Sequence, residues 1–70
     1  MGQSSVAAKT EISGASTKSF SDAIQAAFSR ATETVRGITG MRVIDQRLAA
    51  ADDKILEYRV RVEVLFILES

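Results

Sequence analysis

The 70-residue sequence contains no cysteine and no histidine. It therefore cannot form a disulfide, a zinc site with nitrogen and sulfur ligands, or the Ser-His-Asp and Cys-His arrangements of nucleophilic enzymes. Any catalysis would depend on carboxylates, lysine, tyrosine or a bound cofactor. We expect a protein that is not an enzyme.

A net charge is also lacking, since nine basic and nine acidic residues cancel to a formal charge of zero. No long-range field attracts nucleic acid or an anionic membrane. The longest apolar run, Val64 to Leu68, is too short to cross a bilayer, and residues 1–5 lack the features of a signal peptide. We expect a cytoplasmic protein with no nucleic-acid or membrane partner.

The length allows one small domain, residues 1–70, in which we expect residues 1–5 to be disordered. Burying about 60% of the unfolded surface contributes about 100 kcal/mol, against about 105 kcal/mol of ordering entropy. This balance is near zero, and neither a disulfide nor zinc can improve it. Association with other copies is therefore the predicted route to stability.

Segments of different periodicity follow one another along the chain. Alternation over residues 6–13 predicts a short strand. Ser19 followed by Asp22 resembles a capping box, so a helix should begin there. Gly37 and Gly40 supply stop signals. Between these signals, apolar residues recur at helical spacing: Phe20, Ala23, Ile24, Ala27, Phe28, Ala31, Val35 and Ile38.

The C-terminal part predicts a hairpin, with strands over residues 41–50 and 55–69 and a turn over residues 51–54. In the last strand every second residue from Tyr58 is apolar, and this face should pack on the helix. The opposite face begins polar and becomes apolar near its end, so we expect it to meet other subunits. The order strand, helix, strand, strand predicts an α+β layer pair.

Two features could bind a ligand but have simpler explanations. Asp52 and Asp53 could ligate a hard cation, although acidic pairs in hairpin turns are usually solvated. Residues 14–16 precede the helix and could place backbone N–H groups around a phosphate. They lack the glycine spacing of nucleotide-binding loops, and a strand-to-helix turn explains them better.

The last strand offers two further candidates. Arg59 and Arg61 alternate with Glu57 and Glu63, which favours cross-strand charge pairing, with an anion or cofactor phosphate docked on the sheet as the alternative. Tyr58 lies on the apolar side, where a core tyrosine is a better explanation than a general acid.

Several short segments occur in a characteristic order along residues 10–69: Gly14-Ala15-Ser16, Ser19-Phe20, Arg30-Ala31-Thr32-Glu33-Thr34-Val35, Val43-Ile44-Asp45-Gln46 and the ending from Tyr58 to Phe66. In this combination they resemble the dodecin family. The resemblance implies a three-stranded antiparallel sheet packed on one helix. It also implies a homododecamer, a hollow shell of twelve copies, which would supply the association expected above.

The resemblance also indicates which positions of this sequence correspond to the flavin-binding residues of the family. Flavin-binding dodecins store riboflavin or FMN by stacking it on a tryptophan after the helix, with a glutamine of the last strand bonding the ring. Those positions fall on Gly40 and Arg59 here, which implies impaired flavin binding.

A second branch of the family lacks this tryptophan and binds calcium, and residues 41–46 look closer to that branch. Calcium takes six to eight oxygen ligands, so a site would be completed by other subunits or water. Asp45 is the first candidate ligand, with Asp52 and Asp53 behind it.

We expect a small-ligand binding or storage protein with impaired flavin binding and calcium as a candidate ligand. A flavin-storage dodecin with a remodelled pocket and a purely structural oligomer are the alternatives.

Overall fold

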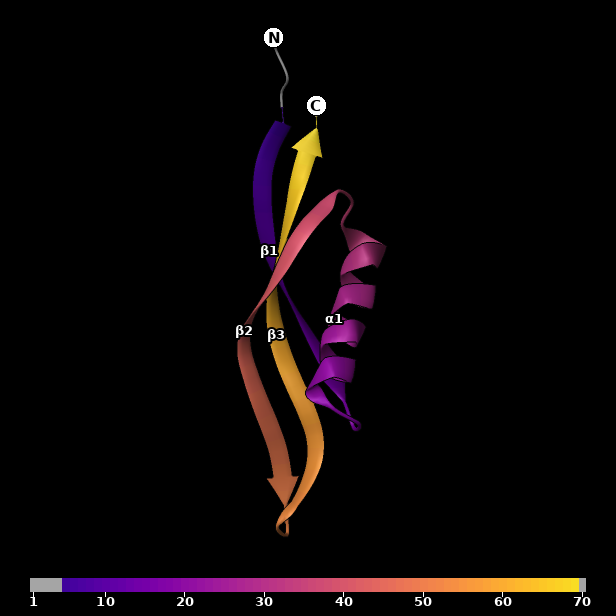
Figure 1. The fold of residues 1–70 in the computed structure, drawn as a ribbon, viewed down its shortest axis with the longest axis vertical. Helices are drawn as coiled ribbons and strands as arrows, with labels where there is room; N and C mark the ends of the chain where they lie inside the picture. The colour runs from indigo at the N-terminus through magenta and orange to yellow at the C-terminus, as the bar shows by residue number, and fades with distance from the viewer. Residues whose placement is uncertain (1–4, 70) are drawn as a thin grey trace.

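The computed structural model describes residues 5–69 and places one helix against one face of a three-stranded antiparallel sheet (Figure 1). In chain order the elements are β1 (Ser5–Ser16), α1 (Phe20–Thr34), β2 (Ile38–Ala51) and β3 (Lys54–Glu69). β3 lies between β1 and β2. The predicted α+β class and element order are confirmed. The disorder expected for residues 1–5 falls on positions 1–4, outside the described residues, whereas Ser5 begins β1.

β1 is longer than predicted, because its pairing with β3 continues past Ser13 to Ser16 opposite Tyr58. Gly14 is thus a strand residue and not part of a turn. Its missing side chain lets α1 pack closely on β1, since a Cβ at this position would overlap the Ala23 carbonyl oxygen and lie 2.7 Å from the Ala27 nitrogen. The small residue expected in a loop instead sets the distance between helix and sheet.

The helix begins where the capping residues predicted. The Ser19 side chain accepts a hydrogen bond from the Asp22 backbone N–H at 3.0 Å, as an N-cap does. The Asp22 carboxylate, however, accepts a hydrogen bond from the Ser16 hydroxyl at 2.7 Å. Asp22 therefore ties the helix start to the end of β1.

The helix ends earlier than predicted, at Thr34, and β2 begins at Ile38 instead of residue 41. Val35 and Ile38 continue the helical spacing, yet Val35 is extended, with φ −127°, and Gly37 turns the chain with φ +72°. The Gly37 carbonyl then accepts a hydrogen bond from the Ile67 N–H, which docks this connection on β3. Val35 and Ile38 therefore lie outside the helix, and Ile38 is the first residue of β2.

The hairpin between β2 and β3 turns through Asp52 and Asp53 alone, both at positive φ (52° and 61°). Positive φ at both central residues is typical of type I′ turns, which aspartate tolerates better than most residues. Register shifts interrupt β2 at three places, one of them between Val43 and Asp45. Ile44 is the extra residue there, and Asp45 opposes Arg61.

The core is small and consists of alanine and valine: Ala23, Ala27 and Ala31 of α1 against Val60, Val62 and Val64 of β3. The predicted core face of β3 is thereby confirmed along the part that α1 covers. Leu68 is 52% exposed, because β3 runs on beyond the helix beside the start of β1 (Figure 1). Phe28, predicted on the apolar helix face, is 40% exposed, because the three alanines occupy the surface that meets the sheet.

The molecule is elongated, with extents of 60 × 18 × 14 Å and a radius of gyration of 15.0 Å, where about 11 Å is typical of this length. The helix packs on β1 and β3 and barely reaches β2. Within residues 5–69, no helix is long and apolar enough to cross a membrane.

Candidate ligand-binding face

The side of the sheet that faces away from α1, called the open face below, carries the charged residues of all three strands. Strand pairing arranges them in cross-strand rows. Glu63 lies between Glu11 and Arg42, and the next row holds Ser13, Arg61 and Asp45. The row after that holds Ala15, Arg59 and Arg47.

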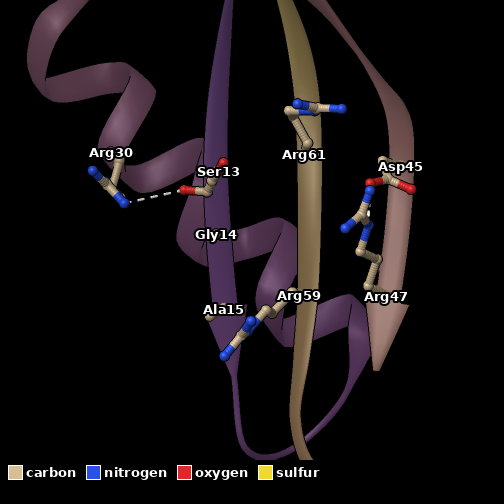
Figure 2. Close-up of a pocket in the computed structure, with 8 residues that line it drawn as sticks. All are labelled: Ser13, Gly14, Ala15, Arg30, Asp45, Arg47, Arg59 and Arg61. Atoms are coloured by element: carbon tan, nitrogen blue, oxygen red, sulfur yellow. Dashed lines mark hydrogen bonds and ion pairs between the residues drawn. The ribbon is translucent and has the colours of Figure 1, made fainter. Parts of the chain in front are cut away.

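A groove of about 330 Å³ follows these rows and is rich in arginine (Figure 2). Figure 2 shows Arg59 extending from β3 toward β1, while Arg61 extends toward β2, where Asp45 and Arg47 lie. The lining residues are Ser13, Gly14, Ala15, Arg30, Asp45, Arg47, Arg59 and Arg61. One carboxylate therefore stands among four guanidinium groups.

Each sheet arginine of the groove has a carboxylate near its Nε atom. Arg47 Nε donates to Asp45 at 2.8 Å, and Arg59 Nε donates to Glu57 at 2.6 Å. Arg61 Nε lies 3.8 Å from a Glu11 oxygen, an ion pair without a hydrogen bond. The predicted cross-strand charge pairing is found in this contact and in the ion pair between Lys9 and Glu63, 3.9 Å apart. Arg47 and Arg59, by contrast, pair along their own strands. All of these side chains are at least partly exposed, so each pair contributes little to stability.

Arg30 is a groove residue that the sequence pattern did not single out. It stands on α1 and reaches over the edge of β1, where its terminal nitrogen donates to the Ser13 carbonyl at 3.2 Å (Figure 2). Its position three residues after the buried Ala27 places it at the border of the packed helix face. The spacing from Ala27 could therefore have marked Arg30 in the sequence as a residue beside the sheet. Predicting its contact with Ser13 would also have required the knowledge that β1 is an edge strand.

The residues predicted as site residues fall into separate places. Asp45 and Arg59 line the same groove. Gly40 opposes Leu65, six positions from Arg59 along β3 and hence about 20 Å away in an extended strand. Asp52 and Asp53 occupy the hairpin turn, which is a similar distance from Asp45 along β2. A single chain brings neither the two flavin positions nor the three acidic residues together.

The acidic residues are also too scattered for a metal site built by one chain. Among the described residues, no three acidic side chains gather in a way that could hold an ion. The first candidate, Asp45, is paired with the Arg47 guanidinium. A cation at Asp45 would have to displace this arginine and recruit oxygens from elsewhere.

The aromatic side chains lie away from the groove. Phe20 and Tyr58 make an edge-to-face contact, with ring centroids 5.1 Å apart, and pack at the border of the core. Tyr58 is therefore a packing residue, as predicted. Phe66 shares the helix side of β3 and Phe28 lies on the helix. None of the residues lining the groove is aromatic, so it offers no ring on which a flat ligand could stack.

Comparison with known proteins identifies the family. The dodecin family model matches residues 6–69. A dodecin mutant from Thermus thermophilus is 35% identical, with a TM-score of 0.87 and coverage of 99% of this chain and 100% of the other. Dodecin from Streptomyces davaonensis is 25% identical, with a TM-score of 0.88 and coverage of 96% and 98%.

A third structure, from Mycobacterium tuberculosis, is described as a calcium chelating immunodominant antigen, calcium dodecin, with a novel calcium-binding site. It is 34% identical, with a TM-score of 0.76 and coverage of 87% of each chain. No curated protein matches the sequence. The chain belongs to the dodecin family of small-ligand-binding proteins, as the sequence resemblance indicated.

Proposed function

We propose that this chain assembles into a closed shell of twelve copies that binds and stores a small ligand without catalysing a reaction. The observation that carries this proposal is the surface left uncovered by the fold. The chain exposes 5130 Å², compared with about 4,300 Å² for a compact monomer of the same mass. This excess of exposed surface is expected of a subunit, because neighbouring copies would bury part of it in the assembly.

The exposed apolar residues support the same proposal. On the helix side of β2, Val43 and Leu48 remain 37% and 50% exposed because α1 does not cover this strand. On the open face, Leu65 is 39% exposed. These are large apolar side chains that contacts with neighbouring copies would bury. Because the uncovered surface lies on both sides of the sheet, one two-fold contact would not bury it, whereas a shell has more than one kind of contact.

The distribution of ligand positions also favours an assembly. Gly40 and Arg59 are about 20 Å apart along the sheet, so a ligand in contact with both would have to lie between two copies. The groove, by contrast, is formed by one chain. The shell would thus combine a site within each subunit and sites between subunits.

Analytical ultracentrifugation tests the assembly. At micromolar concentration the chain should sediment as one species of about twelve copies, and its melting temperature should rise with protein concentration because association stabilises the folded chain. A stable folded monomer at that concentration would rule out the proposed function.

Calcium binding is a second candidate function, favoured by the 34% identity to the calcium dodecin of M. tuberculosis. A site at Asp45 would be completed by oxygens of neighbouring copies, since the described residues of one chain hold no acidic cluster. For this function we expect millimolar calcium to raise the melting temperature of protein first stripped of metal. Binding to the folded assembly alone stabilises it by mass action.

The matched variants for this test are Asp45→Asn and Asp52→Asn, which remove the same charge at two places. Asp45→Asn should reduce the gain in melting temperature more than Asp52→Asn, because the turn aspartate is free to remain solvated. A melting curve that responds to neither calcium nor chelator would exclude calcium and leave the storage of another ligand.

A further inference from the structure

The two edges of the sheet differ in their regularity. β1 and β2 are the edge strands, because β3 lies between them. The pairing of β2 with β3 is shifted at three places, and such irregularities protect an edge from pairing with a further strand. β1 pairs with β3 from Ser5 to Ser16 without a shift. The outer edge of β1 is therefore a regular row of backbone groups.

The hydrogen bond between Arg30 and the Ser13 carbonyl shows which backbone groups of β1 point outward. Because Arg30 reaches this carbonyl across the outer edge of β1, the Ser13 backbone groups point away from β3 (Figure 2). Backbone direction alternates along a strand, so Ala7, Lys9 and Glu11 also direct their N–H and C=O groups outward. Within residues 5–69, no hydrogen bond reaches the outward groups of these three residues. An unpaired edge of this kind is a template for another strand.

The open face of β1 carries a charge pattern that complements itself when the strand is reversed. Lys9 and Glu11 are two residues apart on this face. When two copies of β1 pair antiparallel with Thr10 opposite Thr10, Lys9 of each copy lies opposite Glu11 of the other. A slide of two residues in either direction places lysine opposite lysine or glutamate opposite glutamate, and like charges in such positions are destabilising. Charge therefore selects the register centred on Thr10.

The same register compensates a pair of like charges within the chain. Glu11 and Glu63 are directly opposite each other on β1 and β3, which is unfavourable. Glu63 has Arg42 and Lys9 within 3.2 and 3.9 Å, whereas Glu11 approaches Arg61 alone, at 3.8 Å. Lys9 of a second copy would stand in the same row as Glu11, on the side away from Glu63. It would give Glu11 a second cation.

Exposed apolar surface on the helix side of β1 also fits this arrangement. Val6 lies on that side and is 58% exposed. In the register centred on Thr10 it lies opposite Gly14 of the second copy, the residue on which α1 packs closely. A two-fold axis perpendicular to the sheet keeps both helices on the same side. The helix of each copy would thus cover part of the apolar surface that the other copy exposes at Val6.

We infer that two copies of this chain pair antiparallel along β1, with the two-fold axis at Thr10, and join their sheets into one. This inference rests on the proposed function for the remaining contacts of the shell and names one contact from which the shell is built. Lys9 and Glu11 form the hydrogen-bonded pairs on either side of the axis, and each such pair exchanges both of its N–H···O bonds. Arg30 limits the paired stretch, because it already occupies the Ser13 carbonyl.

Oxidative cross-linking of cysteine variants tests the inference, because the chain has no cysteine of its own. The Thr10 residues of two copies would form a pair without hydrogen bonds, whose Cα atoms lie about 4.5 Å apart, within the range that a disulfide spans. Thr10→Cys should therefore convert most of the chain into disulfide-linked dimers, measured on a denaturing gel without reductant.

Ala8→Cys is the matched control, since Ala8 lies on the same side of the same strand. The inferred register separates the two Ala8 residues by about 14 Å, which is too far for a disulfide. This variant should cross-link at least about tenfold less than Thr10→Cys. Thr39→Cys places the same substitution on the other edge strand and should also stay unlinked. Equal cross-linking of Ala8→Cys and Thr10→Cys, or no disulfide in Thr10→Cys, would overturn the inference.

Sedimentation of the same samples separates this inference from the proposed function. A dodecamer of the Thr10→Cys variant that forms no disulfide would contradict the strand pairing alone. A species of two copies that cross-links through Thr10→Cys, with no larger assembly, would contradict the shell and leave the strand pairing in place.

Discussion

Gly14→Ala should destabilise the protein by about 3 kcal/mol or more, at the upper end of the cost of overpacking a core. The added methyl group would overlap the Ala23 carbonyl oxygen and approach the Ala27 nitrogen to 2.7 Å. These are backbone atoms of a helix, so they cannot move aside as the end of a flexible side chain can. Relief requires α1 to shift away from β1, which would open the alanine and valine core. Urea denaturation at fixed protein concentration measures the loss.

Gly40→Ala is the control for this experiment. A Cβ at Gly40 would lie 3.6 Å from Leu65 Cδ1, an ordinary contact, and alanine loses less backbone freedom on folding than glycine, so this variant should be unchanged or more stable by up to about 1 kcal/mol. Equal stability of the two variants would show that α1 does not pack on Gly14 as described.

Gly40→Trp combined with Arg59→Gln should strengthen riboflavin binding by about tenfold or more, since stacking on an aromatic side chain contributes about 1–3 kcal/mol. The unmodified chain has no tryptophan, and no aromatic residue lines its groove, so its own quenching of riboflavin fluorescence should be slight. An added Cβ at Gly40 would meet only the Leu65 side chain, at an ordinary contact distance of 3.6 Å, so no backbone atom blocks a larger side chain at its first carbon. Titration of riboflavin fluorescence compares the two proteins.

Gly40→Leu with Arg59→Gln is the control, because it adds apolar bulk without a flat ring. It should leave riboflavin binding close to that of the unmodified chain. Tight quenching by the unmodified chain, with flavin retained in the purified shell, would mean that a remodelled pocket binds flavin without tryptophan.

The parts of the fold that could be predicted are those that depend on residues close together in the sequence. Alternation in β3 predicted Val60, Val62 and Val64 as the core because one face of that strand meets a single helix. Ser19 predicted the helix start because an N-cap depends only on the next turn. The helix end could not be predicted in this way. Ile38 belongs to the start of β2, where it lies opposite Phe66, and it occurs at helical spacing from the helix residues only by coincidence.

The candidate site was predictable only in part, because it depends on strand order. Asp45 and Arg59 were singled out separately, but their presence in one groove follows from β3 lying between β1 and β2 and from the register shift at Ile44. Arg30 joins them across the edge of β1. Such contacts arise from tertiary pairing, which a periodicity within one segment does not contain.

Native mass spectrometry of the intact protein tests the central claim most directly, because it reports the number of copies and any retained ligand together. We expect one assembly of about twelve times the 7.6 kDa chain mass, with additional mass from a bound small ligand. A folded species with the mass of a single chain would contradict the account.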